Sequence, residues 1–178
     1  MPISIDAQRL FAELDTLASF SDAPSPAVTR IVYSEADQRA RKYLKTLCRD
    51  ANLEIREDAV GNTFARWPGT EPNLPGIATG SHFDALPFAG RYDGTVGVLG
   101  GLEAIRALQG SGARTKRSIE LLMFTSEEPT RFGIGCLGSR FLTGALDESA
   151  GERLKGTDGK TLDEARAEAG FTGPLSSV

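Results

Sequence analysis

The chain has 178 residues, with 20 basic and 24 acidic side chains, two cysteines and one histidine, His82. Its 40% hydrophobic and 25% charged content is typical of a soluble globular protein and excludes a disordered or collagen-like chain. The net charge of −4 argues against a nucleic-acid-binding domain. Two cysteines are too few for a disulfide scaffold and fit a reducing compartment. Any chemistry that needs an imidazole must use His82 or a residue from outside the chain.

Two helices and a hairpin are predicted in the first part of the chain. Apolar residues at helical spacing predict an amphipathic helix over 6–18. Ser34 is placed to cap a second helix that ends near residue 51, because acidic residues follow it in the first turn. Alternating residues on either side of Gly61-Asn62 predict a hairpin with strands over 53–59 and 63–67.

A strand–helix–strand unit is predicted next. Residues 76–82 favour a short buried strand, 94–108 a helix of small and aliphatic residues, and 118–124 a central strand. Such a crossover unit indicates an α/β fold with a layer of helices on a sheet. In these folds, sites lie at the carboxyl ends of the strands. One more helix is predicted over 162–169.

No segment of the sequence predicts a membrane or secretory protein. The N-terminus lacks a basic patch followed by an apolar run. The longest apolar stretch, 119–124, is far shorter than the roughly 20 residues that span a bilayer. The expected location is therefore cytoplasmic, without membrane or nucleic-acid partners.

Three polar clusters follow predicted strands or precede a helix. His82 and Asp84 lie two apart on an extended segment, so the aspartate can orient the imidazole of a metal ligand. Asp93 precedes the glycine-rich helix, and Glu127 and Glu128 follow the central strand. Two adjacent acids are costly in a poorly solvated cleft unless a cation offsets their charge. One imidazole with several carboxylates suits zinc or manganese.

Each cluster also has an ordinary structural interpretation. His82 alone is more often a hydrogen-bonded structural residue, and Asp84 and Asp93 are common turn or cap residues. Glu127 and Glu128 can stand at a solvated helix N-terminus. Three such clusters at one sheet edge nevertheless favour a metal site over coincidence.

The glycines and cysteines favour packing over chemistry. The glycines at 94, 97, 100 and 101 fit neither phosphate-binding pattern, and their spacing places them on one helix face. Close packing against the sheet explains them better than nucleotide binding. Cys48 and Cys136 lack a Cys-x-x-Cys spacing, so structural thiols are expected.

Two motifs resemble a known family. The run from Gly80 to Pro87, followed by Gly90-Arg91-Tyr92-Asp93-Gly94, resembles the hydantoinase/carbamoylase branch of the M20-type dinuclear metal amidohydrolases. The run from Phe124 to Gly133, followed by 136–140, is most similar to its ureidoglycolate amidohydrolase subfamily. The resemblance covers nearly the whole chain and is strongest from Gly80 to Gly144. It implies a three-layer zinc-peptidase-like catalytic domain with a mixed sheet flanked by helices.

The resemblance also implies roles for the five polar residues. His82 is expected to bind one of two divalent metal ions, Asp93 to bridge them and Glu128 to bind the other. Glu127 is expected to be the general base, and Asp84 to orient the ring of His82. The expected ions are Mn²⁺ rather than Zn²⁺.

The implied reaction is hydrolysis of a small linear ureido or carbamoyl substrate. Ureidoglycolate, which gives glyoxylate, ammonia and carbon dioxide in allantoin degradation, is the expected substrate. Allantoate and N-carbamoyl-L-amino acids are the alternatives. Family members are much longer, so residues 1–178 are expected to be the N-terminal part of the catalytic domain. The resemblance implies a C-terminal catalytic segment and a lid domain through which the parent enzyme forms a homodimer, and both are expected to be absent from this sequence. A truncated remnant or a metal-binding interaction module is the remaining alternative.

Overall fold

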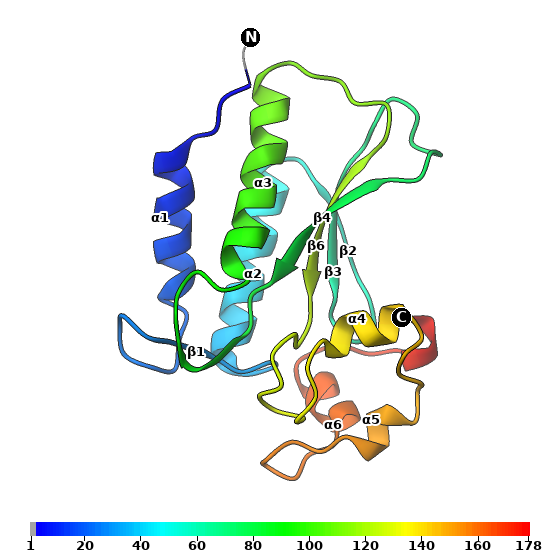
Figure 1. Ribbon diagram of the computed structural model, residues 1–178. Coiled ribbons are helices and arrows are strands. Elements are labelled where there is room, and N and C mark those ends of the chain that lie inside the picture. Colours follow the sequence, from blue (N-terminus) through cyan, green and yellow to red (C-terminus); the bar gives the residue numbers. More distant parts are fainter. Residues whose placement is uncertain (1–2) are drawn as a thin grey trace.

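A four-stranded mixed sheet lies at the centre of the computed structural model, which describes residues 3–178 (Figure 1). Its order is β2-β3-β6-β4. β6 is antiparallel to β3 and parallel to β4, with His82 paired to Phe124 at the carboxyl ends of β4 and β6. The strands are β2 (Glu54–Glu57), β3 (Thr63–Trp67), β4 (Ile77–His82) and β6 (Ile119–Phe124). This arrangement confirms the predicted α/β fold.

Three long helices lie on the same side of the sheet (Figure 1). They are α1 (Ala7–Ala18), α2 (Glu35–Asp50) and α3 (Thr95–Gly110), and all three were predicted from the sequence. The Ser34 hydroxyl accepts a hydrogen bond from the Asp37 amide, as expected of an N-cap. No helix within residues 3–178 is both long and apolar enough to cross a bilayer.

The glycines of α3 explain how closely this helix packs on the sheet. A Cβ atom at Gly97 would lie 2.6 Å from the Ser81 Cβ, and one at Gly101 would lie 2.8 Å from a Leu121 methyl. A Cβ atom at Gly100 would meet nothing within 4 Å. Packing therefore accounts for two of the four glycines, and Gly94 has a separate role described below.

β4 differs from its prediction because most of it is exposed. Residues 77–80 are exposed, and only the end of the strand is buried. The sequence predicts a buried strand here since small and apolar residues follow one another. In the structure β4 is an edge strand paired only with β6, so one of its sides remains open.

A second, two-stranded sheet was not predicted. β1 (Val28–Arg30) pairs antiparallel with β5 (Ala85–Ala89), directly after the His82–Asp84 segment. β5 contains Pro87 and a residue with positive φ, Phe88, which hide its strand character. The fully buried Arg30 donates a 2.6 Å hydrogen bond to the Phe83 carbonyl, and this ties the small sheet to the site.

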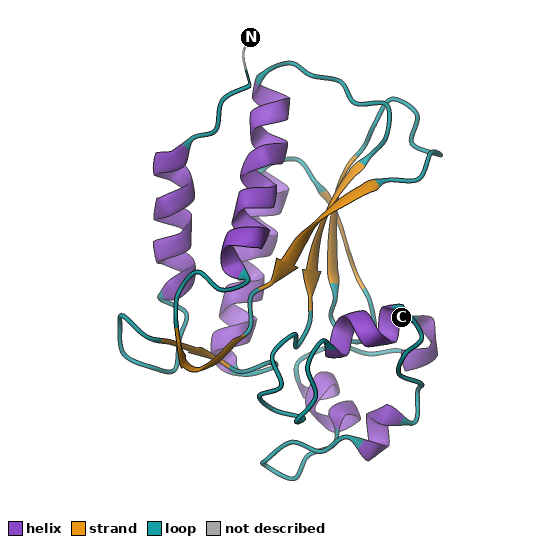
Figure 2. Cartoon of the chain, viewed as in Figure 1, coloured by secondary structure: helices purple, strands orange, loops and turns teal. Residues whose placement is uncertain are grey.

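A helical subdomain covers the carboxyl end of the sheet (Figure 2). Its helices are α4 (Leu137–Leu142), α5 (Ala150–Arg153), α6 (Leu162–Glu168) and the short 3₁₀ helix η1 (Leu175–Ser177). Only α6 was predicted, because α4 and α5 are too short to show a periodic pattern. These helices pack around a second hydrophobic core, separate from the one between the sheet and the three long helices.

Candidate metal centre

Three polar side chains meet at the carboxyl edge of β4 and β6. His82 is the last residue of β4, and Glu127 and Glu128 follow the end of β6. One ligand atom from each of these residues lies within 4.8 Å of the other two, an arrangement that can hold a metal ion. The parallel register of β4 and β6 produces this meeting, because it places the ends of both strands side by side.

The His82 ring lies among carboxylates and is 6% exposed. Its Nδ1 atom lies 3.1 Å from the Asp84 carbonyl oxygen and 3.4 Å from the Asp84 carboxylate. Its Nε2 atom is 3.6 Å from Glu127 Oε2. Burial lowers the pKa of His82, but the hydrogen bonds and charge of Asp84, with the charge of Glu127, outweigh it and raise the pKa to about 9. The ring therefore has a carboxylate beside each nitrogen, with Asp84 beside Nδ1 and Glu127 beside Nε2.

Asp84 connects both halves of this cluster and is 2% exposed. Its Oδ1 accepts a hydrogen bond from the Glu127 amide at 3.2 Å, and its Oδ2 accepts one from the Glu128 amide at 3.0 Å. The same carboxylate lies beside Nδ1 of His82. One buried side chain therefore positions the His82 ring and the backbone of the two glutamates.

The absence of a side chain at Gly94 leaves space for His82. Gly94 has φ +64° and stands at the N-cap of α3. A Cβ atom on it would lie 2.5 Å from the His82 carbonyl oxygen and 2.6 Å from ring atom Nε2. Only glycine meets both the left-handed backbone and this close approach without strain.

Asp93 lies near the cluster but outside the three-residue group. Its Oδ1 is 3.8 Å from Nε2 of His82, and its side chain is 67% exposed. Within residues 3–178, the group whose ligand atoms lie within 4.8 Å of one another contains His82 and the two glutamates but not Asp93. The structure therefore brings all five predicted residues to one edge and holds Asp93 the most loosely.

The two glutamates stand on an irregular loop, not at the helix N-terminus that was the ordinary interpretation of this pair. The next helix, α4, begins at Leu137. Ser126 has φ +52°, a sharp bend just before Glu127. The pKa of Glu128 is raised, first by burial and then by the charge of Glu127. A cation in this cluster would relieve that repulsion.

Cys136 is a contact of Glu127 that the sequence did not indicate. The Cys136 amide donates to the Glu127 carbonyl at 2.7 Å, and its thiol donates to Glu127 Oε1 at 3.4 Å. The hydrogen bond from the thiol to Glu127, together with burial, raises the pKa of Cys136. The two residues are nine apart, so only the tertiary fold brings them together.

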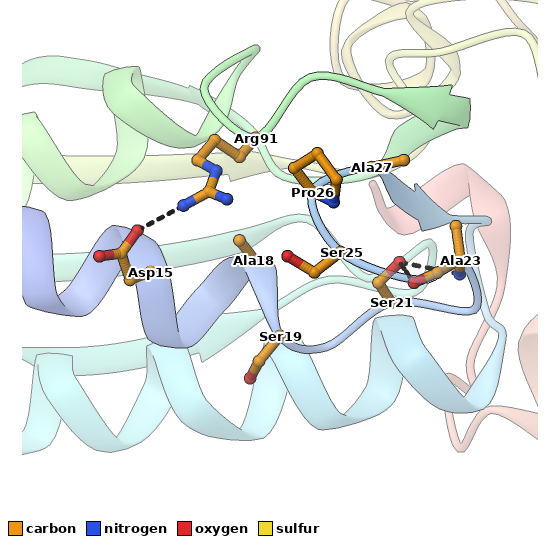
Figure 3. A pocket seen from close by; sticks show the side chains of 9 residues that line it. All are labelled: Asp15, Ala18, Ser19, Ser21, Ala23, Ser25, Pro26, Ala27 and Arg91. Carbon is orange, nitrogen blue, oxygen red and sulfur yellow. Dashed lines mark hydrogen bonds and ion pairs between the residues drawn. The ribbon is translucent and has the colours of Figure 1, made fainter.

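A separate cavity of about 290 Å³ lies beside the end of α1, away from these carboxylates (Figure 3). Arg91 and Asp15 face it and form a 2.7 Å ion pair with one another. Several serines and alanines of the following loop complete its wall. Because Arg91 and Asp15 already pair with one another, neither charge is left to bind a ligand, and the metal cluster remains the candidate site.

The fold and the cluster define an α/β protein with a candidate metal centre at the carboxyl edge of its sheet. Residues 62–156 match the family model described as Peptidase family M28. The chain is 54% identical to an Arabidopsis thaliana protein named ureidoglycolate hydrolase, over 95% of this chain and 36% of that protein. It therefore spans about a third of the length of this curated relative.

Solved structures agree with that relationship. A structure of a protein named AtUAH in complex with glyoxylate has a TM-score of 0.95 and 52% identity, covering 98% of this chain and 43% of that one. A hydantoinase/carbamoylase family amidase from Burkholderia ambifaria has a TM-score of 0.91 and 37% identity, covering 97% and 42%.

The chain belongs to Peptidase family M28 and corresponds to the N-terminal portion of the ureidoglycolate hydrolase-like amidohydrolases of the hydantoinase/carbamoylase family. The predicted branch is thereby confirmed, although the matching family model carries the name M28 where the resemblance suggested M20. The zinc-peptidase-like α/β fold with a mixed sheet flanked by helices is confirmed as well.

Proposed function

We propose that this chain contributes the N-terminal residues of the active site of a metal-dependent amidohydrolase that cleaves ureidoglycolate. The observation that carries the proposal is the meeting of His82, Glu127 and Glu128 within 4.8 Å, behind a buried aspartate. One of these residues ends β4 and the other two follow the end of β6, so the arrangement belongs to the tertiary fold.

The donor set fits divalent metal ions. An imidazole nitrogen and several carboxylate oxygens are borderline-to-hard ligands, which suit Mn²⁺ or Zn²⁺. Burial and then the charge of Glu127 raise the pKa of Glu128, and a cation would offset the repulsion between the two carboxylates. We assign His82 to one ion, Glu128 to a second ion and Asp93 to a bridging position, with Mn²⁺ preferred over Zn²⁺.

Bound metal ions would polarise the attacked carbonyl and the attacking water, which is the chemistry that two-metal hydrolases share. Glu127 is assigned as the general base because its carboxylate is partly exposed and lies 3.6 Å from the His82 ring. It accepts a proton from the water as the oxygen attacks the ureido carbon, and returns that proton to the departing nitrogen. Asp84 orients His82 and holds the amide of Glu127, so the base keeps its position relative to the ring.

Ureidoglycolate is proposed as the substrate because the sequence identity is higher to a ureidoglycolate hydrolase than to an amidase of the wider family. The chain is 54% identical to the Arabidopsis protein named ureidoglycolate hydrolase but 37% identical to the Burkholderia amidase. AtUAH was also solved in complex with glyoxylate and with (S)-hydroxyglycine. The proposed products are glyoxylate, ammonia and carbon dioxide. Allantoate and N-carbamoyl-L-amino acids are the substrates to test against it.

Residues 1–178 are proposed as the N-terminal part of a catalytic domain. The relatives are more than twice as long as the matched region, since the chain covers 43% of AtUAH. We propose that a lid domain for dimerisation and the remaining catalytic segment belong to the part of these relatives that this chain does not match.

A chimera tests the proposal. The matched region of the Arabidopsis ureidoglycolate hydrolase is replaced by this chain, and ammonia release from ureidoglycolate is measured with and without Mn²⁺. We expect Mn²⁺-dependent release, which Glu127→Gln abolishes while Mn²⁺ binding persists. Glu148→Gln, on an exposed loop, is the matched control and keeps the rate. A chimera that folds and binds Mn²⁺ but releases no ammonia, or an active Glu127→Gln variant, would contradict the assignment.

A further inference from the structure

Asn62 lies in the turn between β2 and β3, yet its side chain reaches the loop that carries the glutamates. It is 1% exposed. Its Oδ1 accepts a hydrogen bond from the Thr125 amide at 2.9 Å, and its Nδ2 donates to the Gly138 carbonyl at 3.1 Å. Nδ2 also donates to an Asp58 carboxylate oxygen at 2.8 Å. One amide group therefore joins the β2–β3 turn to the start of the glutamate loop and to the start of α4.

Side-chain acceptors hold three of the backbone amides in the glutamate loop. Asn62 holds the amide of Thr125, and Asp84 holds those of Glu127 and Glu128. The loop has no regular structure, so these bonds replace the backbone ladder that would otherwise order it. Buried amides without such partners would be costly.

The space around Asn62 is shaped for this amide. A Cβ atom at Gly138 would lie 2.1 Å from the Asn62 Oδ1, and 2.7 Å from the Thr125 carbonyl oxygen. A side chain at position 138 would therefore force Asn62 away from Thr125. The Thr125 hydroxyl is held in turn by the buried guanidinium of Arg41, at 3.2 Å.

We infer that Asn62 is a positioning residue for the candidate metal centre. Its hydrogen bond to the Thr125 amide fixes the position of the chain where it leaves β6. The loop that follows places Glu127 and Glu128 beside His82. This role rests on the proposed function, since the glutamates need a fixed position only if they serve a site. Within residues 3–178, the side chain of Asn62 hydrogen-bonds to Asp58, Thr125 and Gly138 and not to the three cluster residues, so it acts through the loop.

Two measurements on the whole chain test the inference. Amide hydrogen exchange, followed by NMR without metal, reports the order of the loop, and calorimetric titration with Mn²⁺ reports the site. In Asn62→Ala we expect exchange at Thr125 to rise about tenfold, in line with the loss of one hydrogen bond. Exchange at Ala65, in the centre of β3, reports global unfolding and should change less than about twofold. Mn²⁺ affinity should fall about tenfold.

A charge swap separates positioning from general stability. Asn62→Asp places a second carboxylate beside Asp58, and the repulsion should release the Thr125 amide. Adding Asp58→Asn restores an amide–carboxylate pair while an oxygen still faces Thr125. The double variant still lacks the donor to the Gly138 carbonyl, so it should regain part, not all, of the Thr125 protection and Mn²⁺ affinity lost in Asn62→Asp. Asn73→Ala, in an exposed loop, is the matched control and should change neither measurement.

The outcomes are distinguishable. Wild-type exchange at Thr125 in Asn62→Ala overturns the inference, as does an equal rise at Thr125 and Ala65, since that result indicates general destabilisation only. A double variant that recovers neither measurement overturns it too. If the wild-type chain binds no Mn²⁺ but Thr125 responds as expected, the loop-positioning role stands and the proposed metal function fails.

Discussion

The two sides of the candidate metal centre are built differently. The side formed by His82 and the glutamate loop is mostly buried, and side-chain hydrogen bonds to Asp84 and Asn62 hold it. The other side carries Asp93, whose carboxylate is 67% exposed and accepts no hydrogen bond within residues 3–178. Half of the site is therefore set by the folded chain itself, and Asp93 stays free to adjust.

The contrast follows from where the residues lie. His82 ends β4 and the glutamates follow the end of its partner β6, so the sheet register brings them near one another and the side-chain hydrogen bonds hold the loop. Asp93 lies in the loop between β5 and α3, whose tip is exposed. A ligand held by packing keeps its geometry before the metal arrives, whereas an exposed carboxylate must be ordered when the metal binds.

Gly94 joins the two sides, and its substitution should have the largest effect on folding. Gly94→Val puts a β-branched residue at positive φ and forces it against His82. The combined strain and overpacking should lower the free energy of unfolding by about 2–5 kcal/mol. Urea denaturation followed by circular dichroism measures this. Gly100→Ala is the control; nothing lies within 4 Å of the added methyl, so it should leave stability unchanged or raise it slightly.

Substitution of Asp84 tests the buried side of the site, which His82 and the glutamate loop form. Asp84→Ala leaves the amides of Glu127 and Glu128 without acceptors, which should cost about 3 kcal/mol of unfolding free energy. It should also weaken Mn²⁺ binding by about 10–100-fold, since His82 loses its orienting carboxylate. Asp84→Asn keeps one oxygen acceptor and should fall in between. Wild-type stability in Asp84→Ala would show that this carboxylate does not hold the loop.

Asp93 tests the exposed side. Asp93→Asn should change the free energy of unfolding by less than about 0.5 kcal/mol, because its side chain is largely solvated. It should still weaken Mn²⁺ binding in a titration, since an amide is a poorer ligand than a carboxylate. A stability loss as large as that of Asp84→Ala would remove the distinction between the two sides. Unchanged Mn²⁺ binding would remove Asp93 from the site.

The smallest expected effect is a difference in how readily the two thiols are alkylated. Cys48 is fully buried, and burial raises its pKa to about 12, whereas Cys136 is partly exposed beside Glu127. Brief alkylation of the native chain should therefore label Cys136 alone, and alkylation in urea should label both. Peptide mapping by mass spectrometry measures the two sites. Equal labelling of Cys48 in the native chain would mean that the core opens more readily than the packing indicates.

Local patterns predicted much of the fold. Helical periodicity and the Ser34 cap predicted α1 and α2, and alternation predicted β2 and β3, because these signals depend on neighbouring residues only. β1, β5, α4 and α5 were missed since they are short or carry breaking residues such as Pro87. The exposure of β4 was also mispredicted, because the composition of a strand does not say whether it has one neighbour or two.

The sequence by itself determined which residues are chemically suited to a metal site and on which strand ends they stand. The single histidine and the adjacent acids are visible as residue types, and the strand–helix–strand pattern places them at one edge. Only the tertiary structure decided that Glu127 joins His82 and Glu128 and that Gly94 leaves space for the imidazole. It also decided that Asn62, in the β2–β3 hairpin, holds the loop that carries the glutamates. Most of these contacts join residues far apart in the sequence, such as Asn62 and Thr125, which are 63 positions apart. Their geometry depends on sheet register and helix packing, which no local pattern encodes.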